Sequence, residues 1–433
     1  MSTPMNPTLS PADRVKQGGE GEALGNIGHV GLLNLGNTCF MNSGLQVLLS
    51  SKHLVKAVME SQVQEESGHT SGRITGKAMH VSFKELIYAS RTTKADIYKP
   101  DKIKNAASRL NKSFIGYGQQ DSFELIQTVL DGLEKETNRA KEVPYKALNT
   151  DGMEYSKAQR LFRENHREKY DSPITEVTCT ELAKCVMCTG CQLKSYSFSY
   201  CQALLLDLPV KGGKNEGNKK RCEKQGWKSN SLSLSALINN SEKAYAVDNY
   251  YCSECKAHRR VNVREWISEP AKCLIIQLKR FRNNDYNTIS CFFWGYSKND
   301  APVEYEDTLE IPCFEFGQNG VAKDDMQPDG TCPASEVDSS TDLSVDYPTD
   351  KSSTCLTAQE SQSQSLPRPT RSYKYRYRGA SLHSGGLGGG HYTALCYGCN
   401  DKYYYCNDSS VTLVDKAKLD AQAYVLLFDR VDP

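Results

Sequence analysis

The chain has 433 residues, enough for two or three domains or one large one, and 53 basic and 52 acidic residues give it a formal net charge of +1. This balance excludes a uniformly basic surface, so binding to nucleic acid or to a membrane would require local patches. No apolar run reaches the ~18 residues of a membrane span, and residues 1–26 lack the apolar core of a secretory signal. We therefore expect a soluble intracellular protein whose 17 cysteines stay reduced and serve catalysis or metal binding.

The first third of the chain is predicted to be mostly helical. A buried helix is expected to begin near Cys39, because apolar residues follow it at helical spacing, and Asn37 or Thr38 is available as its cap. Apolar spacing predicts a second helix around residues 83–87. Residues 121–133 predict a third, with five apolar side chains on one face: Phe123, Ile126, Val129, Leu130 and Leu133.

The remainder is predicted to be mostly β. Residue composition and alternation predict strands at residues 175–182, 195–200, 203–208, 273–281, 303–312, 371–379, 391–397, 402–406 and 423–428. Residues 273–281 resemble a central strand of a sheet. The last strands are expected to close one sheet.

Three segments are expected to lie outside the packed core. Residues 1–25 show no hydrophobic period and are predicted to be a disordered tail. Residues 211–228 hold seven basic and two acidic residues among glycines, which favours a solvated loop over a site for an acidic partner. Residues from about 317 to 367 are acidic, polar and poor in apolar side chains, and are predicted to be a disordered insertion.

Cys39 is the candidate nucleophile. A thiol at a helix N-terminus meets unpaired amides and the positive end of the helix dipole, which favour the thiolate. The same amides can face a developing oxyanion. The alternative is a buried structural cysteine, since free cysteine is among the most buried residue types. Other residues must decide between the two.

A thiolate nucleophile needs a base, and the base needs an orienting acceptor. Among eight histidines, His391 follows a glycine-rich run at residues 384–390 and begins a predicted strand. Asn407 and Asp408 end the next strand, so a hairpin would place an amide or a carboxylate beside the imidazole. The alternatives are a structural histidine and an ordinary Asn-Asp turn. A phosphate-binding loop must be followed by a helix, but a strand is predicted after this glycine run, so dinucleotide binding is disfavoured. A mobile loop that gates access of the substrate fits the sequence better.

Two Cys-x-x-Cys pairs predict a structural zinc ribbon, with the ligands Cys188, Cys191, Cys252 and Cys255. The basic loop at residues 211–228 is expected to fill the long separation between the pairs. Cys185 and His258 have spacings that leave them as alternative ligands. A site of four cysteines is closed, so the metal would support folding and leave catalysis to Cys39.

Together these motifs resemble the ubiquitin-specific protease family of papain-like cysteine deubiquitinases. The matching segments are Gly31–Ser43, Gly116–Glu124, Gln277–Phe281, Gly389–Ala394 and Tyr405–Val411. The resemblance implies an α+β papain-like fold and a catalytic domain over residues 26–430. This domain would have a helical thumb (about 27–140), zinc-ribbon β fingers (about 175–270) and a β-sheet palm.

The resemblance also implies residue roles. Cys39 would be the nucleophile, His391 the base, Asn407 its orienting partner with Asp408 as a substitute, and Asn34 a side chain that stabilises the oxyanion. Asp121 and Glu124 would hold the basic C-terminal tail of ubiquitin, which suits two carboxylates one helical turn apart. Their alternative interpretation is a capping aspartate and a solvated glutamate.

The implied activity is hydrolysis of the bond after the C-terminal glycine of ubiquitin through a thioester, with structural zinc as cofactor. Expected partners are ubiquitin and ubiquitinated proteins, without nucleic acid or membrane, for a monomer in the cytoplasm or nucleus. The alternatives are a protease for another ubiquitin-like modifier, a weakly active or inactive ubiquitin-binding scaffold, and a zinc-ribbon nucleic-acid binder. Residues 211–228 and 373–378 give the last only small basic patches.

Overall fold

The computed structural model describes residues 29–63, 78–92, 97–140, 143–144, 146–209, 232–241, 243–283, 296–313, 371–386, 389–414 and 423–431. The predicted tail, basic loop and acidic insertion lie outside these residues. Among the described residues, no helix combines the length and apolar character needed to cross a bilayer.

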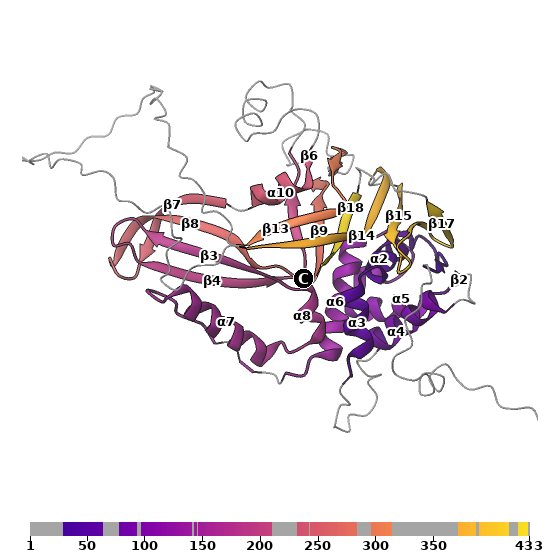
Figure 1. Ribbon diagram of the computed structural model, residues 1–433, viewed down its shortest axis with the longest axis horizontal. Helices are drawn as coiled ribbons and strands as arrows, with labels where there is room; N and C mark the ends of the chain where they lie inside the picture. The colour runs from indigo at the N-terminus through magenta and orange to yellow at the C-terminus, as the bar shows by residue number, and fades with distance from the viewer. Residues whose placement is uncertain are drawn as a thin grey trace, which may run out of the picture.

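A helical layer occupies one end of the molecule (Figure 1). It contains α2 (Cys39–Leu49), α3 (Lys52–Glu60), α4 (Ala78–Arg91), α5 (Asp101–Leu110), the 3₁₀ turn η1 (Lys112–Phe114) and α6 (Ser122–Thr137). Helix α2 begins at Cys39, as predicted, and all 11 of its residues are buried. The predicted apolar face of α6 is also confirmed, because all five of its side chains are buried.

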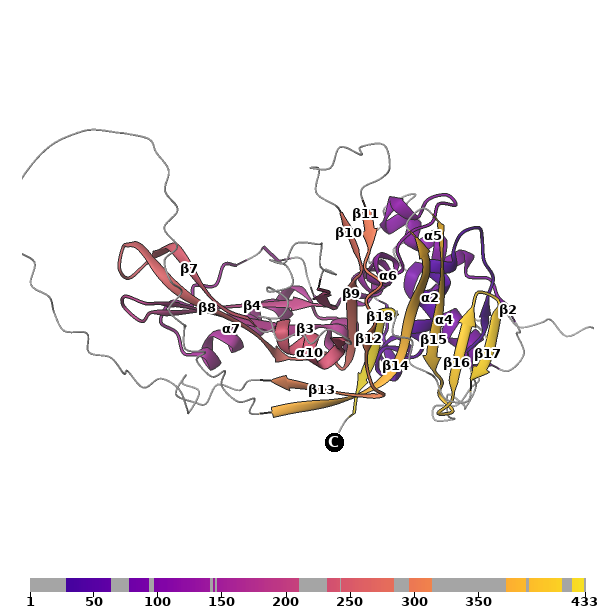
Figure 2. The same ribbon diagram turned by 90° about the horizontal axis from the view of Figure 1, so that it is seen from above.

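An eight-stranded sheet packs against these helices (Figure 2). Its order is β17-β16-β15-β14-β18-β9-β5, with β13 beside β14. The strands are β5 (Leu204–Asp207), β9 (Cys273–Lys279), β13 (Thr308–Cys313), β14 (Arg371–Gly386), β15 (Gly389–Tyr397), β16 (Tyr403–Asn407), β17 (Ser410–Val414) and β18 (Ala423–Arg430). The predicted central strand is β9, and the predicted pairing of β15 with β16 is confirmed, with Ala394 opposite Cys406.

A four-stranded sheet extends away from the helices, in the order β4-β3-β8-β7 (Figure 1). Its strands are β3 (Thr180–Cys188), β4 (Lys194–Cys201), β7 (Lys243–Cys252) and β8 (Ala257–Glu269). Helix α7 (Tyr155–Lys169), which the sequence did not predict, lies along β4. The predicted α+β class, with helical thumb, β-sheet palm and β fingers, is confirmed.

Short elements complete the described fold. They are α8 (Pro173–Thr178), α10 (Leu234–Ser241) and three two-stranded pairs: β1 (Gly31–Leu32) with β2 (Ile97–Tyr98), β6 (Leu232–Ser233) with β12 (Val303–Glu304), and β10 (Phe281–Asn283) with β11 (Tyr296–Lys298).

Three details of the predicted β region are wrong. The predicted strand 175–182 begins as helix α8, because Pro173 takes the first helical position and the Ser172 hydroxyl accepts from the amide of Ile174. The predicted strand 303–312 divides into β12 and β13, which belong to different sheets.

The glycine run was predicted to be a loop, yet four of its glycines extend the β14–β15 hairpin. Gly385 pairs with Gly390, and Gly386 with Gly389. Only glycine fits at Gly390, because an added Cβ would overlap the ring of His383. The run therefore brings two backbones close together directly before His391.

The eight-stranded sheet is apolar on both faces. In β18, Val425 and Leu427 belong to the core shared with the helices, whereas Leu426 and Phe428 belong to the core on the opposite face. This alternation follows from the two-residue period of a strand. The sheet is therefore the central layer that positions everything attached to it.

Asp429 fastens the sheet to the helical layer. Its carboxylate accepts from the Ser51 hydroxyl at 2.6 Å, the Lys52 amide at 2.7 Å and Arg378 Nε at 3.1 Å. A buried charge is tolerated only when it is paired and hydrogen-bonded, and Asp429 satisfies both conditions. The start of α3 is thereby fixed to the end of β18.

Candidate active site

The turn before Cys39 is held in an unusual backbone conformation. Gly36 and Asn37 have φ values of 99° and 52°, in the left-handed region that glycine and asparagine tolerate. The Asn34 side chain stabilises the turn, since its Oδ1 accepts from the amides of Gly36 and Thr38 at 3.0 and 3.1 Å. The chain therefore enters α2 with Cys39 at its first position.

The predicted helix cap differs in detail. Thr38 occupies the capping position, but its side chain bonds no helix amide. Its hydroxyl accepts instead from the amide of Leu35 at 2.8 Å. The first amides of α2 consequently stay available to a ligand or to the thiol.

Burial raises the pKa of the Cys39 thiol above its ordinary value. The amide of Tyr392 donates to the sulfur and lowers the pKa, the charge of Asp408 raises it, and the amides of Phe40 and Cys39 lower it. The helix amides thus lower the pKa, as predicted, while desolvation of the thiol is the largest contribution and raises it. Burial therefore opposes ionisation of the Cys39 thiol.

His391 and Asn407 meet across the β15–β16 pair. His391 Nε2 lies 2.7 Å from Asn407 Oδ1. An amide oxygen only accepts, so Nε2 carries the proton and, in the neutral ring, Nδ1 keeps its lone pair. The amide of Tyr392 donates to the Cys39 sulfur, so the start of β15 lies beside the thiol. Among the described residues, no hydrogen bond joins Cys39 directly to His391.

The carboxylate of Asp408 bonds two side chains of the Cys39 region. Its Oδ2 accepts from Asn34 Nδ2 at 2.9 Å, and its Oδ1 accepts from Asn42 Nδ2 at 2.8 Å. Its carbonyl accepts from the amide of Leu32 at 2.8 Å. Asn42 was not predicted, and its only signal in the sequence is an asparagine three residues after Cys39 on an otherwise apolar helix; the structure shows it to be buried.

Asp121 and Glu124 are both engaged within the protein. Asp121 caps α6 through Oδ1, which accepts from the amides of Phe123 and Glu124, while Oδ2 accepts from the Tyr424 hydroxyl at 2.6 Å. Glu124 Oε1 accepts from Asn111 Nδ2 at 2.7 Å. Asp121 thus occupies the capping position of α6 and Glu124 lies in its first turn, so both carboxylates are at the start of this helix.

Gln119 is a second residue of this region whose role the sequence did not indicate. Its Nε2 donates to the carbonyl of Gly390 at 2.8 Å, and its Oε1 accepts from the amide of Gly390 at 3.3 Å. The segment before α6 is thereby attached to the residue that precedes His391.

The four predicted metal ligands gather at the far end of the fingers. The sulfur atoms of Cys188, Cys191, Cys252 and Cys255 lie within 4.8 Å of one another. Two of these distances are 3.9 Å and 3.6 Å. Tetrahedral zinc with Zn–S bonds of about 2.3 Å places its sulfurs about 3.8 Å apart, so the donor set and spacing fit zinc.

The alternative ligands lie outside this cluster. The thiol of Cys185 bonds the side chain of Tyr196, and His258 Nδ1 contacts the carbonyl of Asn249 at 3.1 Å. The structure therefore resolves the choice that the cysteine spacing left open.

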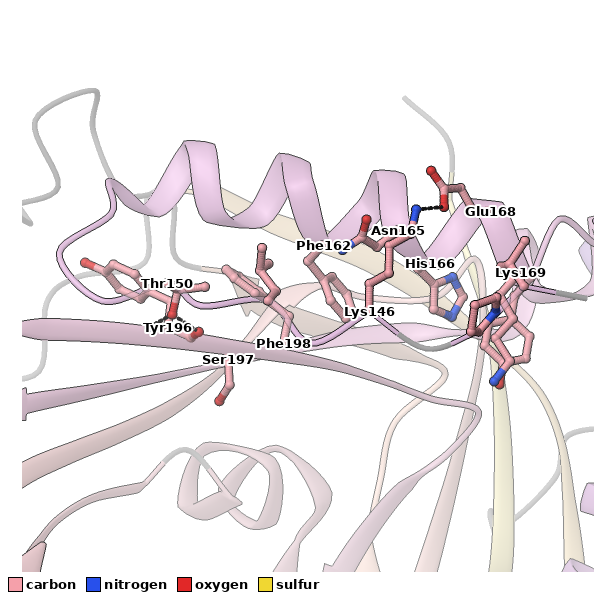
Figure 3. A pocket seen from close by; sticks show the side chains of 14 residues that line it. Lys146, Thr150, Phe162, Asn165, His166, Glu168, Lys169, Tyr196, Ser197 and Phe198 are labelled. Atoms are coloured by element: carbon pink, nitrogen blue, oxygen red, sulfur yellow. Dashed lines mark hydrogen bonds and ion pairs between the residues drawn. The ribbon is translucent and has the colours of Figure 1, made fainter. Parts of the chain in front are cut away.

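A hollow of about 270 Å³ lies between α7 and β4, away from these sites (Figure 3). Its aromatic lining includes Phe162 and His166 from the helix and Tyr196 and Phe198 from the strand. None of the predicted site residues lines it.

The chain is similar to known proteins over most of its length. The family model described as "Ubiquitin carboxyl-terminal hydrolase" matches residues 30–428. "Ubiquitin carboxyl-terminal hydrolase 2" of Rattus norvegicus is 26% identical over 416 residues, covering 94% of this chain and 54% of that protein. "Ubiquitin carboxyl-terminal hydrolase 15" of Homo sapiens is 33% identical over 185 residues, covering 42% of this chain and 19% of that protein. The chain thus spans about half the length of the first of these relatives.

Solved structures show the same fold. The SAGA Ubp8/Sgf11/Sus1/Sgf73 DUB module bound to ubiquitin aldehyde contains a chain that aligns with a TM-score of 0.58 at 19% identity. The alignment covers 94% of this chain and 70% of that one.

The raised pKa of Cys39 predicts its reactivity toward iodoacetamide. Only the thiolate reacts, so alkylation should be slow at pH 7 and should accelerate as pH rises into the alkaline range. Mass spectrometry of the Cys39 peptide from about pH 6 to about pH 10 measures this, with the same peptide in urea as the unfolded reference. A folded-state midpoint at or below the unfolded one would contradict the prediction.

Proposed function

Because the chain belongs to the ubiquitin carboxyl-terminal hydrolase family, we propose that it is a thiol-dependent deubiquitinase that hydrolyses the peptide or isopeptide bond after the C-terminal glycine of ubiquitin. The observation that carries the proposal is the 2.7 Å contact between His391 Nε2 and Asn407 Oδ1. This contact leaves His391 Nδ1 as the nitrogen that can accept a proton. The amide of the next residue, Tyr392, donates to the Cys39 sulfur. The Ubp8 module, which is described as bound to ubiquitin aldehyde, supports ubiquitin as the substrate.

Each covalent step follows from this arrangement. His391 Nδ1 takes the proton of Cys39, and the sulfur forms a bond to the carbonyl carbon of the terminal glycine. The C–N bond then breaks, and the leaving amine receives the proton from His391. In the second half, His391 takes a proton from water as the water oxygen bonds the thioester carbonyl carbon. The C–S bond then breaks, ubiquitin leaves with a free carboxyl group, and His391 returns the proton to the Cys39 sulfur. Asn407 keeps the proton on Nε2 and stabilises the imidazolium that forms twice per cycle.

Because the pKa of Cys39 is raised, the mechanism requires that the thiol lose its proton to His391. A buried neutral thiol is a weak nucleophile, so proton transfer to His391 must accompany attack or precede it. We propose that the substrate tail, by excluding water from the contact, brings the imidazole and the thiol into hydrogen-bonding distance.

The oxyanion would be stabilised by donors around the start of α2. The amides of Cys39 and Phe40 already act on the sulfur, and Asn34 Nδ2 has two protons of which Asp408 accepts one. We propose that the second proton faces the oxyanion. Asp408 would then be a positioning residue that orients Asn34.

The basic tail of ubiquitin would be held on the thumb. Asn111 and Ser113 both donate to Glu124 Oε1, and no residue in the described segments donates to Oε2. We propose that Oε2 receives an arginine of the tail, which makes a strong charge-assisted hydrogen bond. Asp121, whose oxygens are occupied, would contribute its charge at longer range.

We also propose that Cys188, Cys191, Cys252 and Cys255 hold a structural zinc ion. The metal would cross-link the ends of β3 and β7, where the local hydrophobic cluster is small. Four thiolates close the coordination sphere, so the ion would stabilise the fingers without taking part in hydrolysis.

The central prediction concerns Cys39. The protein should release a fluorophore from the C-terminus of ubiquitin, and Cys39→Ala should lower the rate by at least about 10³-fold, because the nucleophile is lost. Cys201→Ala, at a partly buried thiol on β4, is the matched control and should keep its activity. A Cys39→Ala variant as active as the wild type would disprove the assignment. Preference for another ubiquitin-like modifier in the same assay would favour the alternative protease function.

Asn34 and Glu124 should affect different kinetic constants. Asn34→Ala should lower kcat by about 10²- to 10³-fold, as loss of an oxyanion donor does, with little change in ubiquitin Kd. Glu124→Gln should raise KM with kcat nearly unchanged. If Asn34→Ala weakens binding and leaves kcat intact, the oxyanion role is wrong.

Zinc binding in the fingers is tested by substituting two cysteines, one inside the four-cysteine cluster and one outside it. Cys191→Ser should lose the ribbon zinc, and amides of β3 and β7 should exchange hydrogen faster, because the cross-link is gone. Cys185→Ser, on β3 but outside the cluster, should retain both the metal and the protection. Elemental analysis and hydrogen exchange measure the two effects. Equal zinc content in Cys191→Ser and wild-type protein would refute the ribbon site.

A further inference from the structure

A second cluster of potential metal ligands lies where the segment before β1 meets β15 and β16. Ligand atoms of His29, Cys396 and Cys406 lie within 4.8 Å of one another. Both cysteines are buried and free, and the two thiols are hydrogen-bonded to each other. None of the three is used by the hydrolysis described above.

The strand register brings the two sulfurs together. Ala394 is opposite Cys406, and Cys396 is opposite Tyr404, so the cysteines are diagonal neighbours on one face of the β15–β16 pair. Residues 398–402 join the two strands, and the register of the pair brings the thiols together in the folded backbone.

The histidine is oriented toward these thiols by a residue of α2. Gln46 Nε2 donates to the carbonyl of Val30 at 2.7 Å, so Gln46 Oε1 faces His29 Nδ1 at 3.0 Å as an acceptor. Nδ1 must then carry the proton, which leaves the Nε2 lone pair as the available ligand. Metal-bound histidines characteristically donate their other N–H to such an oxygen.

We propose that His29, Cys396 and Cys406 form a second metal site, which takes a thiophilic cation and holds zinc in the cell. Two thiolates and one imidazole are a known zinc donor set, and the absence of oxygen ligands from the set disfavours magnesium and calcium. Three protein ligands leave a fourth position for water or for a further ligand.

A cation bound at this cluster would connect the elements that carry the proposed catalytic residues. Cys406 directly precedes Asn407, and Cys396 shares β15 with His391. His29 contacts Gln46 on the helix that begins with Cys39. A bound cation would therefore fasten both strands of the histidine–asparagine pair to the segment that leads into the nucleophile.

Zinc content of the intact, purified chain tests the proposal. Cys396→Ala and His29→Ala should each bind one zinc fewer per chain than the wild type. Cys313→Ala, at another buried free cysteine, and His53→Ala, at another partly buried histidine, are matched controls and should bind as much as the wild type. The measured quantity is a difference between variants, so it does not depend on occupancy of the ribbon.

A second measurement identifies the ligands. After cobalt replaces zinc, the thiolate-to-cobalt absorption should fall in Cys396→Ala and Cys406→Ser, while His29→Ala should lose imidazole scattering in X-ray absorption. His29 lies at the edge of the core, so its variant decides the matter if a cysteine variant fails to fold. Wild-type zinc content in folded His29→Ala and in Cys396→Ala would overturn the proposal and leave the cluster as core packing.

Discussion

The arrangement of the site depends on one carboxylate that joins two distant parts of the chain. Asp408 accepts from Asn34 and Asn42, which flank Cys39, while its backbone belongs to the turn that follows Asn407. Its φ of 47° is a conformation that aspartate adopts at some cost, and the surrounding hydrogen bonds maintain it. The segment around Cys39 and the turn after Asn407 are thus held in one hydrogen-bonded unit, although they are far apart in sequence.

Polar side chains connect the helical layer to the eight-stranded sheet at several other places. Asp429 connects β18 to the start of α3, Tyr424 bonds Asp121, and Gln119 bonds Gly390. These polar links fix the helical layer against the sheet, while the hydrophobic cores on the two faces of the sheet bury its apolar side chains.

Sequence reasoning located the features that depend on local pattern. The helix at Cys39 followed from apolar spacing, and the four ribbon cysteines followed from their pairing. Helix α8 was missed because Thr175 and Val177 favour strands, whereas the capping by Ser172 outweighs that preference. The Asp408 contacts and the His29–Cys396–Cys406 cluster were missed for another reason. Both depend on which side chains the tertiary fold brings together, and neither has a characteristic spacing in the sequence.

The position of β18 in the sheet has a consequence for the synthesis of the protein. Residues 423–430 enter the sheet between β14 and β9, strands that are made earlier, and they contribute to both hydrophobic cores. A nascent chain that lacks them exposes the apolar sides of its neighbouring strands and leaves Ser51 without Asp429. The eight-stranded sheet therefore completes its packing only after these residues leave the ribosome.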